Sequence, residues 1–129
     1  MRFTGLLLQE SLDDLSVLER LNITKVETWE PGERGKPAGP VWTATFFEGD
    51  ESEADETAAM ISRAMKDLYW YANIHLPTDE IVIFAREVFR YVRFDAEARK
   101  APEDYARSLG VPEHQIDWER DLRDDDATP

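Results

Sequence analysis

Apolar residues recur along this chain with two different periods, one of two residues and one of three to four. A two-residue alternation, or a short run rich in β-branched and aromatic residues, is typical of a strand. An apolar stripe at every third or fourth position is typical of a helix. We expect six strands, at residues 2–9, 23–30, 41–48, 69–76, 81–85 and 88–94. We expect helices at residues 11–21 and 52–68, and a short one from Pro102 to Leu109.

Residues at the ends of these elements support the boundaries. Ser11 and Ser52 are N-cap candidates, because a serine side chain accepts a hydrogen bond from the first helical N–H groups. Gly110 follows the last predicted helix and suits the left-handed conformation in which many helices end. Three prolines and three glycines lie within residues 31–40. They predict a mobile connection between the two arms of a hairpin.

The order of the elements predicts an α+β fold. The first six follow the order βαββαβ, which is the ferredoxin-like pattern of two layers, with an antiparallel sheet and helices on one face. The hairpin at 81–94 and the short helix after it are additions at the C-terminal side. This interpretation depends on element order alone. Ile116 and Trp118 are predicted to dock back, so that residues 1–118 form one domain and residues 119–129 an acidic, disordered tail.

The chain is strongly acidic. Its 129 residues include 28 acidic and 15 basic ones, for a net charge of −13. Such a surface repels the phosphates of nucleic acids and anionic lipids, so we expect neither a nucleic-acid nor a membrane partner. Most of the excess lies in residues 48–67 and 117–129. Because the first block surrounds the start of a predicted helix, the helix dipole already accounts for it, and the charge is weak evidence for a basic partner.

Several kinds of chemistry are excluded or unsupported. The chain has no cysteine, which excludes disulfides, thiolate metal sites and a cysteine nucleophile. It shows no long apolar run and no secretory signal, so a cytoplasmic location is expected. Residues 32–36 lack the spacing of a phosphate-binding loop, and residues 50–56 lack the ligand pattern of a calcium loop. We therefore predict no catalytic residue, no metal and no cofactor.

The most informative candidate site is a row of side chains on the predicted strand 69–76. If the alternate residues from Trp70 to Leu76 face the helices, the other row lies on an open sheet face. Tyrosines suit an interface, because they combine a rigid apolar ring with a polar tip. The predicted binding residues are Tyr69, Tyr71, Asn73 and His75, with Arg90 from the following hairpin. The alternatives are an ordinary solvent-facing row and, for His75, a general base or metal ligand beside Asp79 and Glu80.

Two functions from different classes follow. The first is a non-catalytic interaction protein that recognises another protein through the aromatic sheet face and the acidic surface, or that binds a second copy of itself as a homo-oligomer. The alternative is a small-molecule-binding domain or small enzyme, with its site on the open sheet face or at a dimer seam. The second function depends only on analogy between folds. The first is favoured because no catalytic set of residues is visible.

Overall fold

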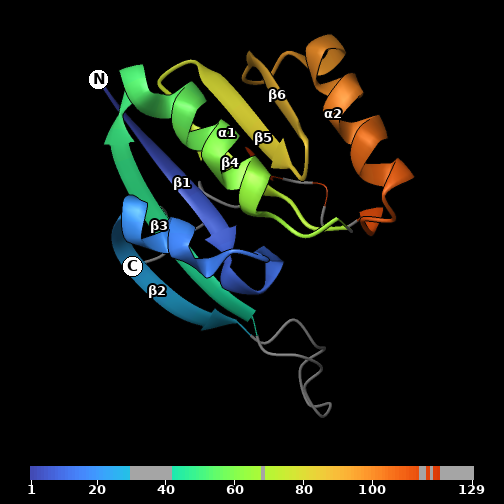
Figure 1. Ribbon diagram of the computed structural model, residues 1–129. Coiled ribbons are helices and arrows are strands. Elements are labelled where there is room, and N and C mark those ends of the chain that lie inside the picture. Colours follow the sequence, from blue (N-terminus) through green and yellow to red (C-terminus); the bar gives the residue numbers. More distant parts are fainter. Residues whose placement is uncertain (30–41, 68, 114–115, 117, 120–129) are drawn as a thin grey trace.

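The computed structural model describes residues 1–29, 42–67, 69–113, 116 and 118–119. As predicted, the fold is α+β. One antiparallel sheet holds six strands in the order β2-β3-β1-β4-β5-β6 (Figure 1). The strands are β1 Arg2–Leu8, β2 Asn22–Trp29, β3 Trp42–Asp50, β4 Ala72–His75, β5 Asp79–Phe84 and β6 Glu87–Val92. The helices are α1 Ala54–Ala64 and α2 Ala96–Ser108, with 3-10 turns η1 Gln9–Ser11, η2 Leu15–Arg20 and η3 Glu51–Glu53.

The two helices pack on opposite faces of the sheet, which we call the α1 face and the α2 face. Ala58 and Ile61 of α1 share a buried cluster with sheet residues such as Ile74 and Ile81. Ala106 of α2 shares a second cluster with Val82 and Phe84, which alternate with the first set along β5. Because successive strand residues point to opposite faces, β5 is buried on both of them. The prediction that all helices lie on one face of the sheet is wrong. α1 and α2 cover opposite faces of this part of the sheet.

The α1 face at β1 and β3 depends on two glycines that lie under aromatic rings. Gly5 pairs with Phe47 across the two strands, and Phe3 pairs with Gly49. A Cβ atom on Gly49 would lie 2.6 Å from Cζ of Phe3, and one on Gly5 would clash with the Phe47 ring. The rings meet edge to face, with centroids 6.2 Å apart. The two cross-strand pairs therefore fill this part of the core by placing each ring over a position without a side chain.

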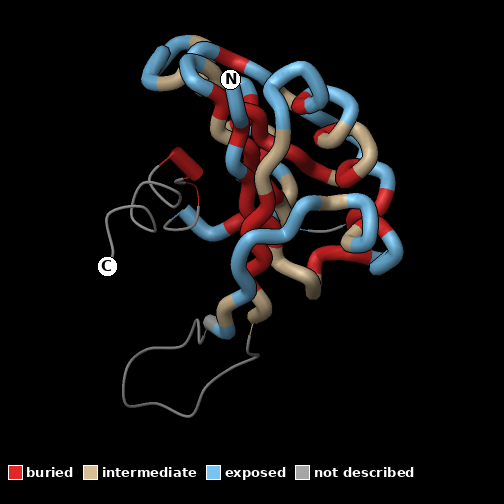
Figure 2. Tube along the Cα trace, turned by 90° about the vertical axis from the view of Figure 1, so that its left-hand side faces the viewer, coloured by how far each residue is buried: buried red, intermediate tan, exposed pale blue. Residues whose placement is uncertain are grey.

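The α2 face is completed by the residues that follow α2. Ile116 and Trp118 are buried against β5 and β6, which confirms the prediction that they dock back. Gly110, at φ +90°, ends the helix region in the left-handed conformation that was predicted for it. Figure 2 shows the buried segments gathered in the interior strands, with exposed segments on the outer turns. The predicted connection 31–40 and residues 120–129 lie outside the described part of the chain.

The prediction of an α-helix over residues 11–21 is wrong, because tertiary contacts hold the start of the segment extended. Leu12 forms an isolated bridge with Met65, and the N–H groups of Asp13 and Asp14 both donate to the carbonyl oxygen of Ala64. Of the segment predicted to be this helix, residues 15–20 are helical after Leu12, and they form the 3-10 turn η2. The Asp14 side chain caps this turn by accepting a hydrogen bond from the Ser16 N–H group.

The predicted boundaries of the two helices also need correction. Asp50, not Ser52, provides the side-chain cap before α1, and it caps the 3-10 turn η3. α2 begins at Ala96, where Asp95 accepts hydrogen bonds from two backbone N–H groups. Pro102 therefore lies inside the helix and does not start it. The ferredoxin-like arrangement with an added hairpin is not confirmed by the strand order.

Candidate functional site

The predicted row on strand 69–76 is not a single open surface. β4 includes only Ala72–His75, and Asn73 on it is 1% exposed. Tyr71 is half-buried, with its ring centroid 5.5 Å from that of Trp118. The expected exposure of these residues is wrong because Ile116, Trp118 and α2 cover this face. Tyr69 is the member of the row that is exposed.

Arg90, the fifth predicted residue, lies on the α1 face and not with the row. Its Nε donates to Asp79 Oδ2 at 2.8 Å, and its Nη1 donates to Asp55 Oδ1 at 3.0 Å. These hydrogen bonds, first to Asp79 and then to Asp55, raise the pKa of Arg90 above its usual value. Arg90 thus connects the start of α1 to the sheet, which is a structural role.

His75 lies in a buried polar cluster with Asn73, Glu80 and Arg93, which we call the β4–β5 cluster. His75 Nδ1 contacts Glu80 Oε1, and the Glu80 side chain is completely buried. Asn73 Nδ2 donates to Glu80 Oε2 at 3.2 Å, and Arg93 Nε donates to Glu80 Oε1 at 3.3 Å. The register of the β4–β5 pair creates this cluster, because it places His75 opposite Glu80 and Asn73 opposite Val82.

The electrostatics of Glu80 are set by its burial. Loss of water around the carboxylate raises the pKa of Glu80, and the contacts from His75, Asn73 and Arg93 offset only part of that rise. The other ring nitrogen of His75, Nε2, is buried and has no hydrogen-bond partner among the described residues. A histidine oriented by a carboxylate is a common arrangement for a base or a metal ligand.

The surroundings of His75 offer little for either role. Within the described ranges, no group of three or more histidine or acidic side chains could hold a metal ion. A hollow of about 150 Å³ lies between η2 and α1 and is lined by residues such as Asp14, Arg20 and Arg63, and no residue of the β4–β5 cluster lines it. The geometry of the β4–β5 cluster therefore fits a buried structural network around Glu80 better than a site of chemistry, with Nε2 of His75 as the polar atom that has no described partner.

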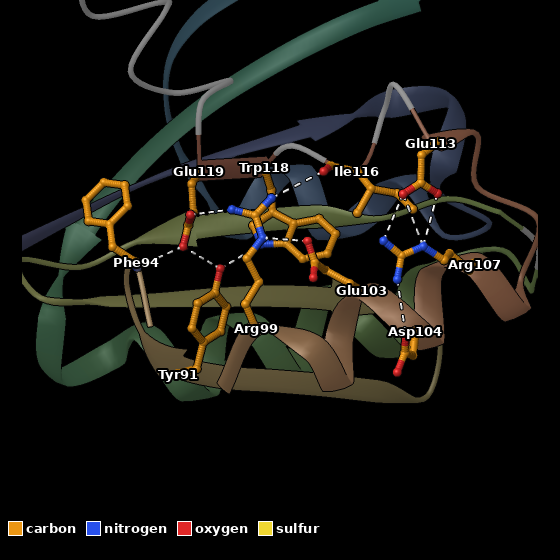
Figure 3. Close-up of polar contacts among 10 residues, drawn as sticks. All are labelled: Tyr91, Phe94, Arg99, Glu103, Asp104, Arg107, Glu113, Ile116, Trp118 and Glu119. Atoms are coloured by element: carbon orange, nitrogen blue, oxygen red, sulfur yellow. Dashed lines mark hydrogen bonds and ion pairs between the residues drawn. The ribbon is translucent and has the colours of Figure 1, made fainter. Parts of the chain in front are cut away.

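A second polar cluster holds the segment after α2 in place, and we call it the Glu119 cluster (Figure 3). Tyr91 Oη donates to Glu119 Oε2 at 2.7 Å, and the Phe94 N–H donates to the same oxygen at 3.1 Å. Arg99 of α2 pairs with Glu119 Oε1 and also donates from Nη2 to the Ile116 carbonyl oxygen at 3.2 Å. These bonds join β6, α2 and the last described residues.

Trp118 connects the two clusters. Its indole Nε1 donates to Tyr91 Oη at 2.9 Å, while its carbonyl oxygen accepts from Asn73 Nδ2 at 3.0 Å. The Arg99 guanidinium lies over the indole ring, 5.3 Å from the centroid. Trp118 is completely buried, so both of its polar groups need these partners. The polar network on the α2 face is therefore continuous from β4 to α2.

The ionisable groups of the Glu119 cluster are held in defined states. Burial by itself raises the pKa of Glu119, but the bonds from Tyr91, the Phe94 amide and Arg99 outweigh it, and the pKa lies below its usual range. Burial, followed by the bond to Glu119, raises the pKa of Tyr91 above its usual value. Glu119 is thus an ionised acceptor and Tyr91 a neutral donor at neutral pH.

Three partly accessible aromatic side chains, those of Trp42, Tyr69 and Trp70, lie in contact, and we call them the aromatic cluster. Tyr69 stacks on Trp70 with centroids 5.3 Å apart and planes 27° apart. Trp42 meets Trp70 edge to face at 6.1 Å. Tyr69 is 46% exposed, and the two indoles are half-buried. Three large rings therefore lie together, and the exposed ring of Tyr69 packs on the half-buried indole of Trp70.

Sequence reasoning noticed Tyr69 but missed Trp42, and it missed the roles of Glu80, Arg99 and Glu119. The signal for Trp42 was its position at the start of a strand with an aromatic pattern. Arg99 and Glu103 have the helical spacing of an ion pair, and their side chains are 2.9 Å apart. Glu119 gave no usable signal, because it lies among many acidic residues and only the fold shows that it is buried.

The comparisons with known proteins give no relative. No family model, no curated protein and no solved structure matches this chain. Over the described residues, no helix has the length and apolar character needed to cross a membrane. The function is therefore argued from the geometry alone.

Proposed function

We propose that this chain is a non-catalytic interaction protein that recognises another protein through the aromatic cluster and its acidic surface. The observation that carries the proposal is the stacked pair of Tyr69 and Trp70, with Tyr69 46% exposed and Trp42 edge to face with Trp70. A cytoplasmic location is part of the proposal, supported by a chain without cysteines to form disulfides.

The physical case depends on the stiffness of the cluster. Aromatic residues are enriched at the centres of protein interfaces, where they bury a large area. A side chain that is already stacked loses less conformational entropy on binding than a free one. Tyr69 also presents a phenol group that can exchange a water hydrogen bond for one to a partner. A rigid, half-exposed tyrosine is therefore well suited to contribute binding energy.

The acidic surface adds long-range attraction to a basic partner. Four acidic side chains around the start of α1 are exposed, namely Glu51, Glu53, Asp55 and Glu56. Such charges raise the rate of encounter with a basic surface more than they raise the final affinity. Binding should accordingly weaken as salt screens the charges.

The test is capture of a partner from a cell lysate by the immobilised full chain at low and high salt. A specific partner should bind the wild type at low salt, and Tyr69→Ala should lose most of it while the variant stays folded by circular dichroism. Phe94→Ala is the matched control, because Phe94 is an aromatic residue with 60% exposure in another part of the fold. Capture that is equal for Tyr69→Ala and the wild type would contradict the proposal.

The ferredoxin-like arrangement is part of the same proposal at the level of the fold. In its support, β1 to β4 lie side by side in the order β2-β3-β1-β4, and the β5–β6 hairpin continues the sheet beyond β4. The 3-10 turns that replace the first helix are the main departure from that pattern.

A second candidate function, binding of a small molecule, is favoured by one observation. His75 is oriented by Glu80 through Nδ1, and its Nε2 has no described partner. A ligand with a hydrogen-bonding group could meet Nε2 if the covering segment moved. Imidazole NMR signals of His75, followed while small polar fragments are added, would test it. No shift for any fragment in the wild type would remove this candidate.

A further inference from the structure

β2 is an end strand of the sheet, and no described strand pairs with its outer edge. It is also poorly covered, since Val26 is 53% exposed and Ile23 is 37% exposed. An end strand presents a row of backbone N–H and C=O groups that can pair with another strand. Of the two end strands, β2 is the longer, with eight residues against six in β6.

The middle of β2 is complementary to itself when a second copy runs antiparallel. Residues 24–28 read Thr-Lys-Val-Glu-Thr. With a two-fold axis at Val26, each Lys25 lies opposite Glu27 of the second copy, Val26 lies opposite Val26, and Thr24 lies opposite Thr28. Opposite charges, β-branched pairs and threonine pairs are each favourable across an antiparallel ladder.

The neighbouring registers do not have this property. A two-fold axis at Lys25 places two lysines opposite each other, and an axis at Glu27 places two glutamates opposite each other, which is destabilising. An axis between two residues would set side chains of opposite sheet faces against each other. Charge complementarity therefore selects the register centred on Val26.

The existing contacts of Lys25 and Glu27 agree with this register. Within one chain, Lys25 Nζ lies 3.5 Å from Glu27 Oε2 and 4.5 Å from the centre of the Phe46 ring. Both side chains remain about two-fifths exposed, at 42% and 41%. The two charges are thus on the same sheet face and partly in water, from where they can add a cross-strand pair. The register shift between Ile23 and Lys25 interrupts regular pairing with β3 at Thr24, which keeps the favourable segment short.

We propose that β2 pairs with β2 of a second copy of this chain, antiparallel and centred on Val26, to form one continuous sheet across a symmetric dimer. An interface of this kind uses the same surface from both copies and closes at two. Backbone hydrogen bonds supply the affinity, and the two Lys25–Glu27 pairs set the register. The inference goes beyond the proposed function, because it involves the β2 edge and not the aromatic cluster.

Sedimentation velocity of the full chain over a range of concentrations tests the dimer. We expect a reversible monomer–dimer equilibrium for the wild type. Val26→Lys places two lysines at the axis and should weaken the dimer by about tenfold or more. Val92→Lys is the matched control, since Val92 is 58% exposed on the other end strand and should leave the dimer unchanged. A wild-type chain that stays monomeric at all concentrations overturns the inference.

Charge reversal tests the register itself. Lys25→Glu and Glu27→Lys should each weaken the dimer by about tenfold, because each sets like charges opposite each other. The double variant with both reversals has the wild-type net charge and should recover most of the affinity. If the double variant is no better than the single ones, the register is wrong. Thermal unfolding of each variant separates the loss of the dimer from the loss of the contact within the strand.

The outcome is separable from that of the proposed function. Tyr69→Ala should leave the dimer unchanged, and Val26→Lys should leave partner capture unchanged. A dimer that is equally weakened by Tyr69→Ala would place the interface at the aromatic cluster and overturn the β2 register.

Discussion

The two ends of the sheet are built in opposite ways. At β4–β6, helix α1 covers one face, and α2 with Ile116 and Trp118 covers the other. At β2 the strand is mostly exposed and has an unpaired outer edge among the described elements. Val82 of β5 is completely buried, whereas Val26 of β2 is 53% exposed. The comparison shows that the β4–β6 end of the sheet buries its side chains in the core, whereas the β2 end leaves its side chains and backbone edge accessible for contacts.

Polar groups follow the same division. The covered end contains two buried glutamates, Glu80 and Glu119, and both are surrounded by donors. Their pKa shifts are opposite. Burial dominates at Glu80 and raises its pKa, whereas the bonds from Tyr91, the Phe94 amide and Arg99 outweigh burial at Glu119 and lower its pKa. Each carboxylate has three donors, so the balance between burial and these contacts, and not the number of donors, sets the direction of each shift.

Trp118→Ala should produce the largest loss of stability. The variant removes a completely buried indole from the α2 face, and with it the hydrogen bond that Nε1 donates to Tyr91 Oη. We expect a loss of about 3–5 kcal/mol in the free energy of unfolding, measured by urea titration. A loss below about 1 kcal/mol would show that this segment contributes little to the covered end.

The same substitution at the two ends gives a matched comparison. Val82→Ala should cost about 2 kcal/mol, because it leaves a cavity at a completely buried position. Val26→Ala should change the free energy of unfolding by less than about 0.5 kcal/mol. Equal losses, measured by urea titration at a concentration where the chain is monomeric, would contradict the proposed division.

Glu119→Gln tests the electrostatics of the covered end. The folded pKa of Glu119 is lowered, so its ionised form stabilises the fold above the unfolded pKa, and this stabilisation disappears as the pH falls through the folded pKa. The variant should be less stable than the wild type by about 1–2 kcal/mol at pH 7. Thermal unfolding should show the difference shrinking below about pH 4. Glu97→Gln, at an exposed position on α2, is the control and should show no such convergence.

Phe94→Gly should have a small effect, and it should stabilise. Phe94 has a φ of +70°, a conformation that disfavours side chains, and it is 60% exposed. Relief of this strain should raise the free energy of unfolding by up to about 1 kcal/mol, and the backbone bond to Glu119 can remain. A clear loss of stability would show that the phenyl ring contributes packing that outweighs the strain.

The strands could be predicted from the sequence because their pattern is local. Apolar runs, β-branched and aromatic content, and the alternation at 69–76 located the six strands, and the prediction that Ile116 and Trp118 dock back is confirmed by their burial. The helix at 11–21 could not be excluded locally, because the bridge from Leu12 to Met65 depends on residues far along the chain. The predicted start of α2 is wrong because proline is favoured in the first turn of a helix, which points to Pro102, whereas Asp95 provides the actual N-cap.

The site was harder to predict than the fold, because it depends on what covers each face. The alternation of residues 69–76 correctly assigned Ala72, Ile74 and Leu76 to the α1 core. It could not show that the opposite face is covered by α2 and Trp118, which belong to later parts of the sequence. Asn73 and His75 were therefore expected to be exposed, and Glu80 was considered only as a possible partner of His75.

The position of β1 has a consequence for the order of folding. β1 lies inside the sheet, where Leu6 pairs with Phe46 on one side and with Asn73 on the other. Both partners are distant in sequence, so long loops must close before either ladder forms, and such contacts form late. The β5–β6 hairpin, with its short turn at Ala85 and Arg86, has no such delay. We therefore expect this hairpin to be an early structured unit and β1 to be inserted in the rate-limiting step.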